Sequence, residues 1–228
     1  MGHVGAFFDM DKTLIAENSG SLYMKRRYER GELSAMELAR GLGAYLQYKV
    51  GVLDLAAWTR EMTKEFAGRS VAEIERQAEE ELVEPLIAAL YPDARALVEE
   101  HQDRGDVVAI VSGSTRFVVA PLARHLGIEY TLTTRLEEAD GRFTGRVVEP
   151  VCFEEGKIHW LRQLVADHDV DLARSWFYTD SITDVPLLEM VGHPVAVNPD
   201  PRLYRQAARR AWPVRVFDPP RPAAGDRR

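Results

Sequence analysis

The chain has 228 residues, 46% of them hydrophobic, and its net charge is −7 because 36 acidic residues outnumber 29 Lys and Arg. This length fits one domain with a modest insertion, and the acidic balance argues against a sequence-independent nucleic-acid binder. The single cysteine, Cys152, excludes an internal disulfide and a thiolate-rich zinc site. We expect a cytoplasmic monomer or homodimer without a signal peptide, a membrane span or a nucleic-acid partner.

The first predicted element is a buried strand over Val4–Phe8, where strand-forming apolar residues end directly before Asp9. From residue 19 to about residue 85, apolar side chains recur at three- and four-residue intervals among many charges, with breaks at Gly31 and Gly51. This spacing predicts a helical insertion of about four helices.

Beyond residue 92 the pattern alternates between helix and strand. The predicted elements are a helix over 94–104 closed by Gly105, a strand over 107–111, a helix over 115–126 closed by Gly127, a β-hairpin over 138–148 with its turn at Asp140 and Gly141, a helix over 155–166, a strand over 176–179, a short helix over 184–190 and a strand over 194–197. Strands separated by helices favour a doubly wound, Rossmann-like parallel sheet, which binds ligands at the carboxyl ends of its strands. The sequence thus predicts an α/β core over 1–16 and 86–218, an all-helical insertion over 17–85 and a disordered tail over 219–228.

Asp9 and Asp11 come directly after the first predicted strand. Two carboxylates so close together repel each other unless a cation or a ligand compensates them, which suggests metal binding or acid-base work. One could attack phosphorus while the other supplies and removes protons. The alternative is that both residues only begin a solvated turn.

Two further polar groups follow predicted strands or begin predicted helices. Ser112 and Gly113 stand between a strand and a helix, where a hydroxyl and free backbone N–H groups form a phosphate cradle, unless the hydroxyls here only cap the helix. Lys157 lies near a helix start, where a cation opposes the helix dipole. Neutralising phosphoryl oxygens would explain that placement, and a solvated lysine paired with a neighbouring Glu is the alternative.

Asp180 and Asp184 follow the compact strand over 176–179. Oxygen ligands at another strand end suit Mg²⁺, which takes a few carboxylates together with water and substrate phosphate. Asp184 could instead be only the N-cap of the short helix that follows.

These clusters resemble the motifs of a known family. FFDMDKTLI is similar to the hydrophobic-DxDxT signature of the haloacid dehalogenase superfamily of phosphohydrolases, and the segments around Ser112, Lys157 and Asp180 resemble its later motifs in the same order. DSITDVPLLEMVGHPVAVNPDPRL resembles in particular the phosphoserine-phosphatase-like branch, subfamily IB. The resemblance implies a Mg²⁺-dependent phosphomonoesterase that forms an aspartyl-phosphate and closes its helical insertion, as a cap, over a small phosphorylated metabolite.

The resemblance also implies roles for individual residues, with Asp9 as the nucleophile and Asp11 as the general acid and base. The expected site comprises the catalytic residues Asp9, Asp11, Ser112 and Lys157, the Mg²⁺ ligands Asp9, Asp11, Asp180 and Asp184, and the substrate contacts Thr13, Glu17, Asn18, Arg60 and Gly113. Further candidate contacts from the insertion are Tyr23, Arg26, Arg27 and Arg69.

The chain departs from the family pattern at two positions. Lys12 stands where the signature often has Gly or Ser, and Asn18 stands where phosphoserine phosphatases carry an acidic residue for the substrate ammonium. Histidinol phosphate and phosphoethanolamine therefore stay beside phosphoserine as candidate substrates, and transfer to a small alcohol stays beside hydrolysis. Two other classes also remain open: a non-catalytic phosphate-binding regulatory module, and a dehalogenase that uses the same Asp without Mg²⁺.

Overall fold

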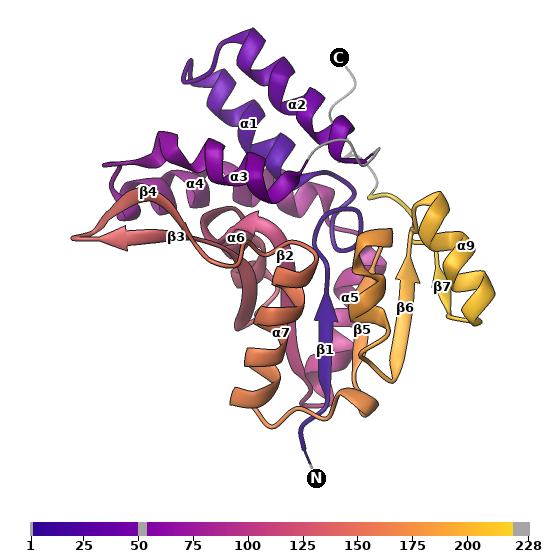
Figure 1. Ribbon diagram of the computed structural model, residues 1–228. Coiled ribbons are helices and arrows are strands. Elements are labelled where there is room, and N and C mark those ends of the chain that lie inside the picture. The colour runs from indigo at the N-terminus through magenta and orange to yellow at the C-terminus, as the bar shows by residue number, and fades with distance from the viewer. Residues whose placement is uncertain (1, 50–53, 221–228) are drawn as a thin grey trace.

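The computed structural model describes residues 2–49 and 54–220 (Figure 1). Predictions for residues 50–53 and 221–228, including the break at Gly51 and most of the tail, lie outside these residues. The strands are β1 (Gly5–Phe8), β2 (Val107–Thr115), β3 (Tyr130–Ala139), β4 (Arg142–Val148), β5 (Trp176–Thr179), β6 (His193–Val197) and β7 (Val214–Arg215). Within the described ranges they form one seven-stranded sheet in the order β4-β3-β2-β1-β5-β6-β7. Its neighbouring strands are parallel except for the antiparallel pair β3 and β4.

The helices fall into two groups. Between β1 and β2 come α1 (Ser19–Glu29), α2 (Ala35–Lys49), α3 (Leu55–Thr63), the 3-10 turn η1 (Lys64–Phe66), α4 (Val71–Ala89) and α5 (Pro92–Asp103). The others are α6 (Arg116–His125), α7 (Glu155–Asp167), η2 (Leu172–Arg174), η3 (Ile182–Asp184), α8 (Val185–Leu188) and α9 (Pro201–Arg210). Figure 1 shows α1, α2 and α3 beyond the arrowheads of the central strands, so this helical insertion lies over the carboxyl edge of the sheet.

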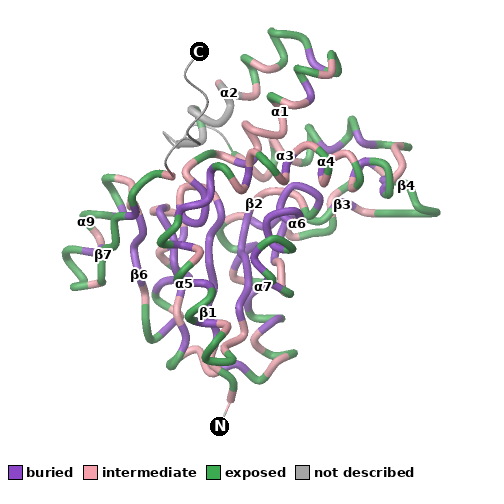
Figure 2. Tube along the Cα trace, turned by 180° about the vertical axis from the view of Figure 1, so that it is seen from behind, coloured by how far each residue is buried: buried purple, intermediate pink, exposed green. Residues whose placement is uncertain are grey.

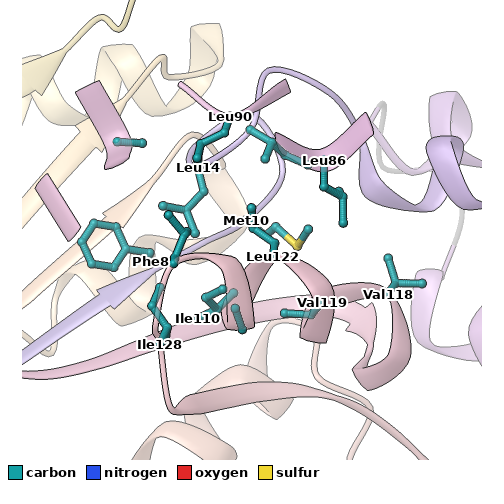
Figure 3. Packing of buried hydrophobic residues seen from close by; sticks show 14 of the residues in the cluster. Phe8, Met10, Leu14, Leu86, Leu90, Ile110, Val118, Val119, Leu122 and Ile128 are labelled. Atoms are coloured by element: carbon teal, nitrogen blue, oxygen red, sulfur yellow. The ribbon is translucent and has the colours of Figure 1, made fainter. Parts of the chain in front are cut away.

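Both faces of the sheet are covered, which explains why its central strands are continuously apolar. Successive residues of a strand point to opposite faces, and Phe7 and Phe8 accordingly belong to different clusters. Phe7 packs in the cluster that contains residues of α7, α8 and α9, while Phe8 packs in the cluster formed with α5 and α6. Figure 2 shows the buried residues concentrated along the strands, and Figure 3 shows Phe8 and Ile110 beside Leu122 of α6.

The central strand β1 marks the point where the sheet is wound in two directions. It pairs with β2 on one side and with β5 on the other, and the chain order runs outwards from it on both sides. In open α/β sheets ligands bind in the crevice at such a point, outside the carboxyl ends of the strands. The predicted doubly wound α/β fold is confirmed, and it directs attention to the residues that follow β1, β2 and β5.

Two predicted segments differ from the structure. Strand β2 continues through Ser112 to Thr115, a stretch predicted to be a turn, because its register shifts there and Thr115 pairs again with Thr134 of β3. The predicted hairpin has its turn where expected, with φ of +50° at Asp140 and +72° at Gly141. Its first strand, however, begins at residue 130, eight residues before the predicted start.

Two elements near the carboxyl terminus, α9 and β7, were not predicted. Helix α9 begins with the N-cap Asp200 and Pro201 but buries little more than Leu203 and Ala207, so its apolar face is too narrow to stand out in the sequence. Helix α4 runs to Ala89 and includes Pro85, so the expected edge of the insertion at residues 85 and 86 falls inside a helix. None of the helices in the described ranges is both long and apolar enough to cross a membrane.

Candidate active site

A buried lysine joins two carboxylates at the carboxyl edge of the sheet. Lys157, in the first turn of α7, donates hydrogen bonds of 2.8 Å to Oδ1 of Asp9 and 2.8 Å to Oδ2 of Asp184. Thr179 at the end of β5 donates to the same Asp184 oxygen at 2.8 Å. Lys157 is 6% exposed, Asp9 8% and Asp184 1%. This burial excludes the interpretation of Lys157 as a solvated surface lysine.

Burial also controls the charge state of this cluster. Desolvation raises the pKa of Asp9, the nearby Asp184 carboxylate raises it further, and Lys157 opposes the rise. Although burial disfavours the charged ammonium, the two carboxylates raise the pKa of Lys157, which holds its proton. One buried cation thus faces two buried carboxylates, and the site has a demand for additional positive charge.

Asp11 is held by the first residues of α1. Its Oδ1 accepts from the backbone N–H of Ser19 at 2.9 Å, and its Oδ2 accepts from Nδ2 of Asn18 at 2.8 Å. The Oδ1 of Asn18 in turn accepts from the N–H of Ser21 and caps α1. Burial raises the pKa of Asp11 although the bond from Ser19 opposes the rise, so this carboxyl is suited to holding and releasing a proton.

Ser112 and Gly113, near the end of β2, bring a hydroxyl and a backbone without a side chain to the cavity that contains Asp9. Ser112 is buried, and its Oγ accepts from the N–H of Ser114 at 3.2 Å. A Cβ on Gly113 would lie 2.2 Å from the Phe153 ring, so only glycine fits there without movement of that ring. Thr115 occupies the N-cap position of α6 but makes no capping bond, and within the described residues its buried Oγ1 has no hydrogen-bond partner.

The acidic residues after β5 offer ligands for a cation. Asp184 lies at the N-cap position of α8, yet its carboxylate bonds Lys157 and Thr179 and caps nothing. Within the described residues its buried Oδ1 has no hydrogen-bond partner. Asp180 is also buried, and it lines the same cavity as Asp9.

The predicted ligand set does not form a complete protein cage for a metal. Across residues 2–49 and 54–220, no three Asp, Glu, His or Cys side chains are arranged to hold an ion by themselves. Mg²⁺ needs only one or two carboxylates, because water and substrate phosphate complete its shell. The unpartnered Asp184 oxygen and the raised pKa of Asp9 fit such an ion.

A cavity of about 660 Å³ connects these clusters to the helical insertion. Of the predicted residues, its lining includes Asp9, Asp11, Asn18, Tyr23, Arg27, Ser112, Gly113, Lys157, Asp180 and Asp184. Thr13, Glu17, Arg26, Arg60 and Arg69 are not part of its lining as the described residues define it. Arg60 donates instead to Glu149 at 2.6 Å, and this long side chain lies outside the site.

Several residues of the cavity were not predicted from the sequence. The rings of Trp58, Phe66, Phe117 and Phe153 line it, and the hydroxyl of Ser19 bonds that of Ser114 at 2.6 Å, which joins α1 to the segment after Ser112. Apolar residues at helical spacing give the same sequence signal whether they face a core or a cavity. The sequence therefore held no signal that separates these rings from core residues.

Comparison with known proteins shows what the chain is similar to. A histidinol-phosphatase of Neisseria meningitidis is 35% identical over 93% of this chain and 98% of its own length. Phosphoserine phosphatase SerB1 of Mycobacterium tuberculosis is 35% identical over 96% of this chain and 72% of its own. A Bordetella pertussis crystal structure, of a protein described as of unknown function, superposes with a TM-score of 0.84 and 33% identity over 94% of this chain and 99% of that one.

The protein has a doubly wound α/β fold with its candidate site at the carboxyl edge of the sheet. The family model described as haloacid dehalogenase-like hydrolase matches residues 6–189, and the chain belongs to that family. Within the family it is a phosphatase of the phosphoserine-phosphatase-like kind.

Proposed function

We propose that this phosphatase hydrolyses the phosphate monoester of a small metabolite in a Mg²⁺-dependent reaction, through an aspartyl-phosphate on Asp9. The observation that carries the proposal is the buried Lys157 ammonium. It lies 2.8 Å from Asp9, which follows β1, and 2.8 Å from Asp184, which follows β5. A carboxylate beside a fixed cation at the floor of a cavity can approach a dianionic phosphate that it would otherwise repel.

The side chains support a division of labour in two steps. Asp9 attacks phosphorus as the bond to the leaving oxygen breaks, and Asp11 gives its proton to that oxygen. Asp11 then takes a proton from water, whose oxygen attacks phosphorus, so that inorganic phosphate leaves and Asp9 is regenerated. Lys157 and Ser112 hold the phosphoryl oxygens during both steps.

Mg²⁺ fits beside Asp9, Asp180 and Asp184, where it would supply positive charge that neutralises the phosphoryl oxygens. The support for this placement is the buried Asp184 Oδ1 without a partner in the described structure. The backbone carbonyl of Asp11 would complete the protein ligands of the proposed site.

The names of the relatives point to two substrates that differ in their leaving group, phosphoserine and histidinol phosphate. Asn18 distinguishes this chain from an enzyme with an acidic ammonium-binding residue. Its amide is already engaged at both ends, as donor to Asp11 and as acceptor from Ser21. We therefore assign Asn18 to the positioning of Asp11 and not to the binding of an ammonium group.

Phosphate release from p-nitrophenyl phosphate tests the proposal. We expect turnover with Mg²⁺, its loss in EDTA, and recovery when Mg²⁺ is added back. Asp9→Asn, a substitution of nearly the same shape, should abolish turnover while the circular dichroism spectrum stays unchanged. Binding of inorganic phosphate without hydrolysis of any monoester would identify a regulatory module instead, and halide release from a haloacid in EDTA would identify a dehalogenase.

A further inference from the structure

The cavity above Asp9 extends from the proposed phosphate site to the helical insertion. Its volume is about 660 Å³, within the range of about 300–1,000 Å³ in which clefts enclose drug-sized ligands. In the proposed reaction the phosphate is held at the end formed by Asp9, Ser112 and Lys157. The rest of the volume lies against the helical insertion and is available to the leaving group.

Rings line this part of the cavity. Apart from Phe153, whose ring lies against Gly113, the aromatic and thioether side chains of the lining are Tyr23, Met24, Trp58, Met62, Phe66 and Phe117. The ring centroids of Tyr23 and Phe117 are 5.4 Å apart, as are those of Phe66 and Phe117, so part of the wall is held by contacts between its own rings. Aromatic surfaces of this kind favour a planar apolar ligand group through offset or edge-to-face contacts.

The buried cation of the wall is already neutralised. Arg27 is 7% exposed and donates from Nη1 and Nη2 to the two carboxylate oxygens of Glu65, the latter at 3.2 Å, and from Nε to Glu32 at 3.2 Å. A substrate carboxylate would have to displace Glu65 from a two-point ion pair and leave that acid uncompensated. Arg27 therefore shapes the cavity without offering a place for a second anion.

Among the described residues, the other cationic side chains of the lining are Lys12, Arg40 and Lys157, and two of them are already engaged. Lys157 belongs to the phosphate end, and Lys12 donates its ammonium to the carbonyl of Ala16. Arg40 on α2 is exposed to solvent and has no such bond in the described structure. Removal of Arg40 therefore tests whether a cation of the lining binds a substrate carboxylate.

We propose that the substrate is the phosphate monoester of an alcohol that carries a ring and no carboxylate, and that Trp58 is a specificity-determining residue for the ring. The inference rests on the proposed phosphatase function and narrows its substrate class. The overall reaction converts the ester and water into the ring-bearing alcohol and inorganic phosphate. Trp58 on α3 is half-buried and lies outside the catalytic cluster, so it can be replaced at smaller cost than the buried Phe66.

Four esters separate the effect of the ring from the effect of the carboxylate. They are 2-phenylethyl phosphate, with a ring alone, ethyl phosphate, with neither group, O-phospho-L-serine, with a carboxylate and an ammonium group but no ring, and phenyllactate phosphate, with a ring and a carboxylate. We expect kcat/KM for 2-phenylethyl phosphate to exceed each of the other three values at least tenfold. Trp58→Ala should reduce the ratio of 2-phenylethyl to ethyl phosphate at least tenfold, and Trp58→Phe should restore most of it.

Tyr204, outside the cavity, provides a control for the loss of an aromatic ring. Tyr204→Ala removes an exposed ring of α9 far from the cavity lining and should leave the ratio unchanged. Equal rates with ethyl and 2-phenylethyl phosphate, or an unchanged ratio in Trp58→Ala, overturn the inference while leaving the phosphatase function intact. A preference for O-phospho-L-serine that disappears in Arg40→Ala also overturns it. Failure to hydrolyse all four esters and p-nitrophenyl phosphate overturns the proposed function together with this inference.

Discussion

Replacing Lys157 with methionine removes the cation between Asp9 and Asp184 while preserving much of the side-chain volume. At an effective dielectric constant of about 20, each of the two 2.8 Å contacts contributes about 6 kcal/mol of attraction before the cost of burying the charges. Breaking a buried ion pair by removing one partner costs about 3–5 kcal/mol of folding free energy. Since both carboxylates lose their partner, we expect Lys157→Met to lower the free energy of unfolding by at least about 3 kcal/mol.

A second substitution shows whether this loss comes from charge. Asp184→Asn removes one of the two uncompensated carboxylates, so in the Lys157→Met background it should restore at least about 1 kcal/mol. In the background with Lys157 intact, the same Asp184→Asn should destabilise the protein. Lys64→Met, at an exposed lysine that pairs with Glu61, is the control and should change the free energy of unfolding by less than about 1 kcal/mol.

The measurement is equilibrium urea unfolding in EDTA, followed by circular dichroism, of the wild type, the two single variants at residues 157 and 184, their double variant and the Lys64→Met control. Phosphate release in Mg²⁺ is measured for the same five proteins. Loss of the lysine should also reduce kcat by a factor of about 10² to 10³, comparable to the loss of one fixed donor from a catalytic site. The double variant should regain stability but not activity. A Lys157→Met protein as stable as the wild type, or equal effects of Asp184→Asn in both backgrounds, would refute the charge-balance reasoning.

Three further predictions concern other parts of the structure. Asn18→Ala removes the amide that bonds Asp11 and caps α1, so steady-state kinetics should show kcat reduced about tenfold or more with little change in KM, and an unchanged kcat would contradict the positioning role. Gly113→Ala should lower the unfolding free energy by about 1–3 kcal/mol because the new Cβ meets the Phe153 ring, and Phe153→Leu should recover part of this loss in urea unfolding. Burial lowers the pKa of His101, so the unfolded chain gains a proton before the folded one as the pH falls below about 6.5. The free energy of unfolding should therefore fall by up to about 1.4 kcal/mol per pH unit in this range. His101→Gln should remove this contribution from the pH dependence of urea unfolding.

The sequence carries the central part of the fold because the relevant signals are local. The strand before Asp9 is a short apolar run, and the hairpin turn at Asp140 and Gly141 uses residues that tolerate positive φ. Strand β3 was predicted only in part, although its first residues, Tyr130 to Thr134, are of strand-forming types and pair with β2. Helix α9 was not predicted; its buried residues are Leu203 and Ala207.

The site divides in the same way between local and long-range information. Asp9, Asp11 and Lys157 could be named from short motifs, since each follows a strand or begins a helix. The ion pair of Arg27 with Glu65 joins residues 38 positions apart, and the fit of Phe153 against Gly113 joins residues on different elements. Such contacts depend on the assembled fold, and a single sequence contains no local pattern that specifies them.

The most direct test of the central claim is mass spectrometry of the enzyme quenched in acid during turnover of a phosphate monoester. The account predicts that a peptide containing Asp9 gains the mass of one phosphoryl group in the presence of Mg²⁺. Asp9→Asn should show no such gain. Asp11→Asn should release phosphate slowly, and its Asp9 peptide should gain the phosphoryl group if Asp9 can still attack the ester without the Asp11 proton. Full turnover by the wild type without a phosphorylated Asp9 peptide, or normal turnover by Asp9→Asn, would contradict the assignment of Asp9 as the nucleophile.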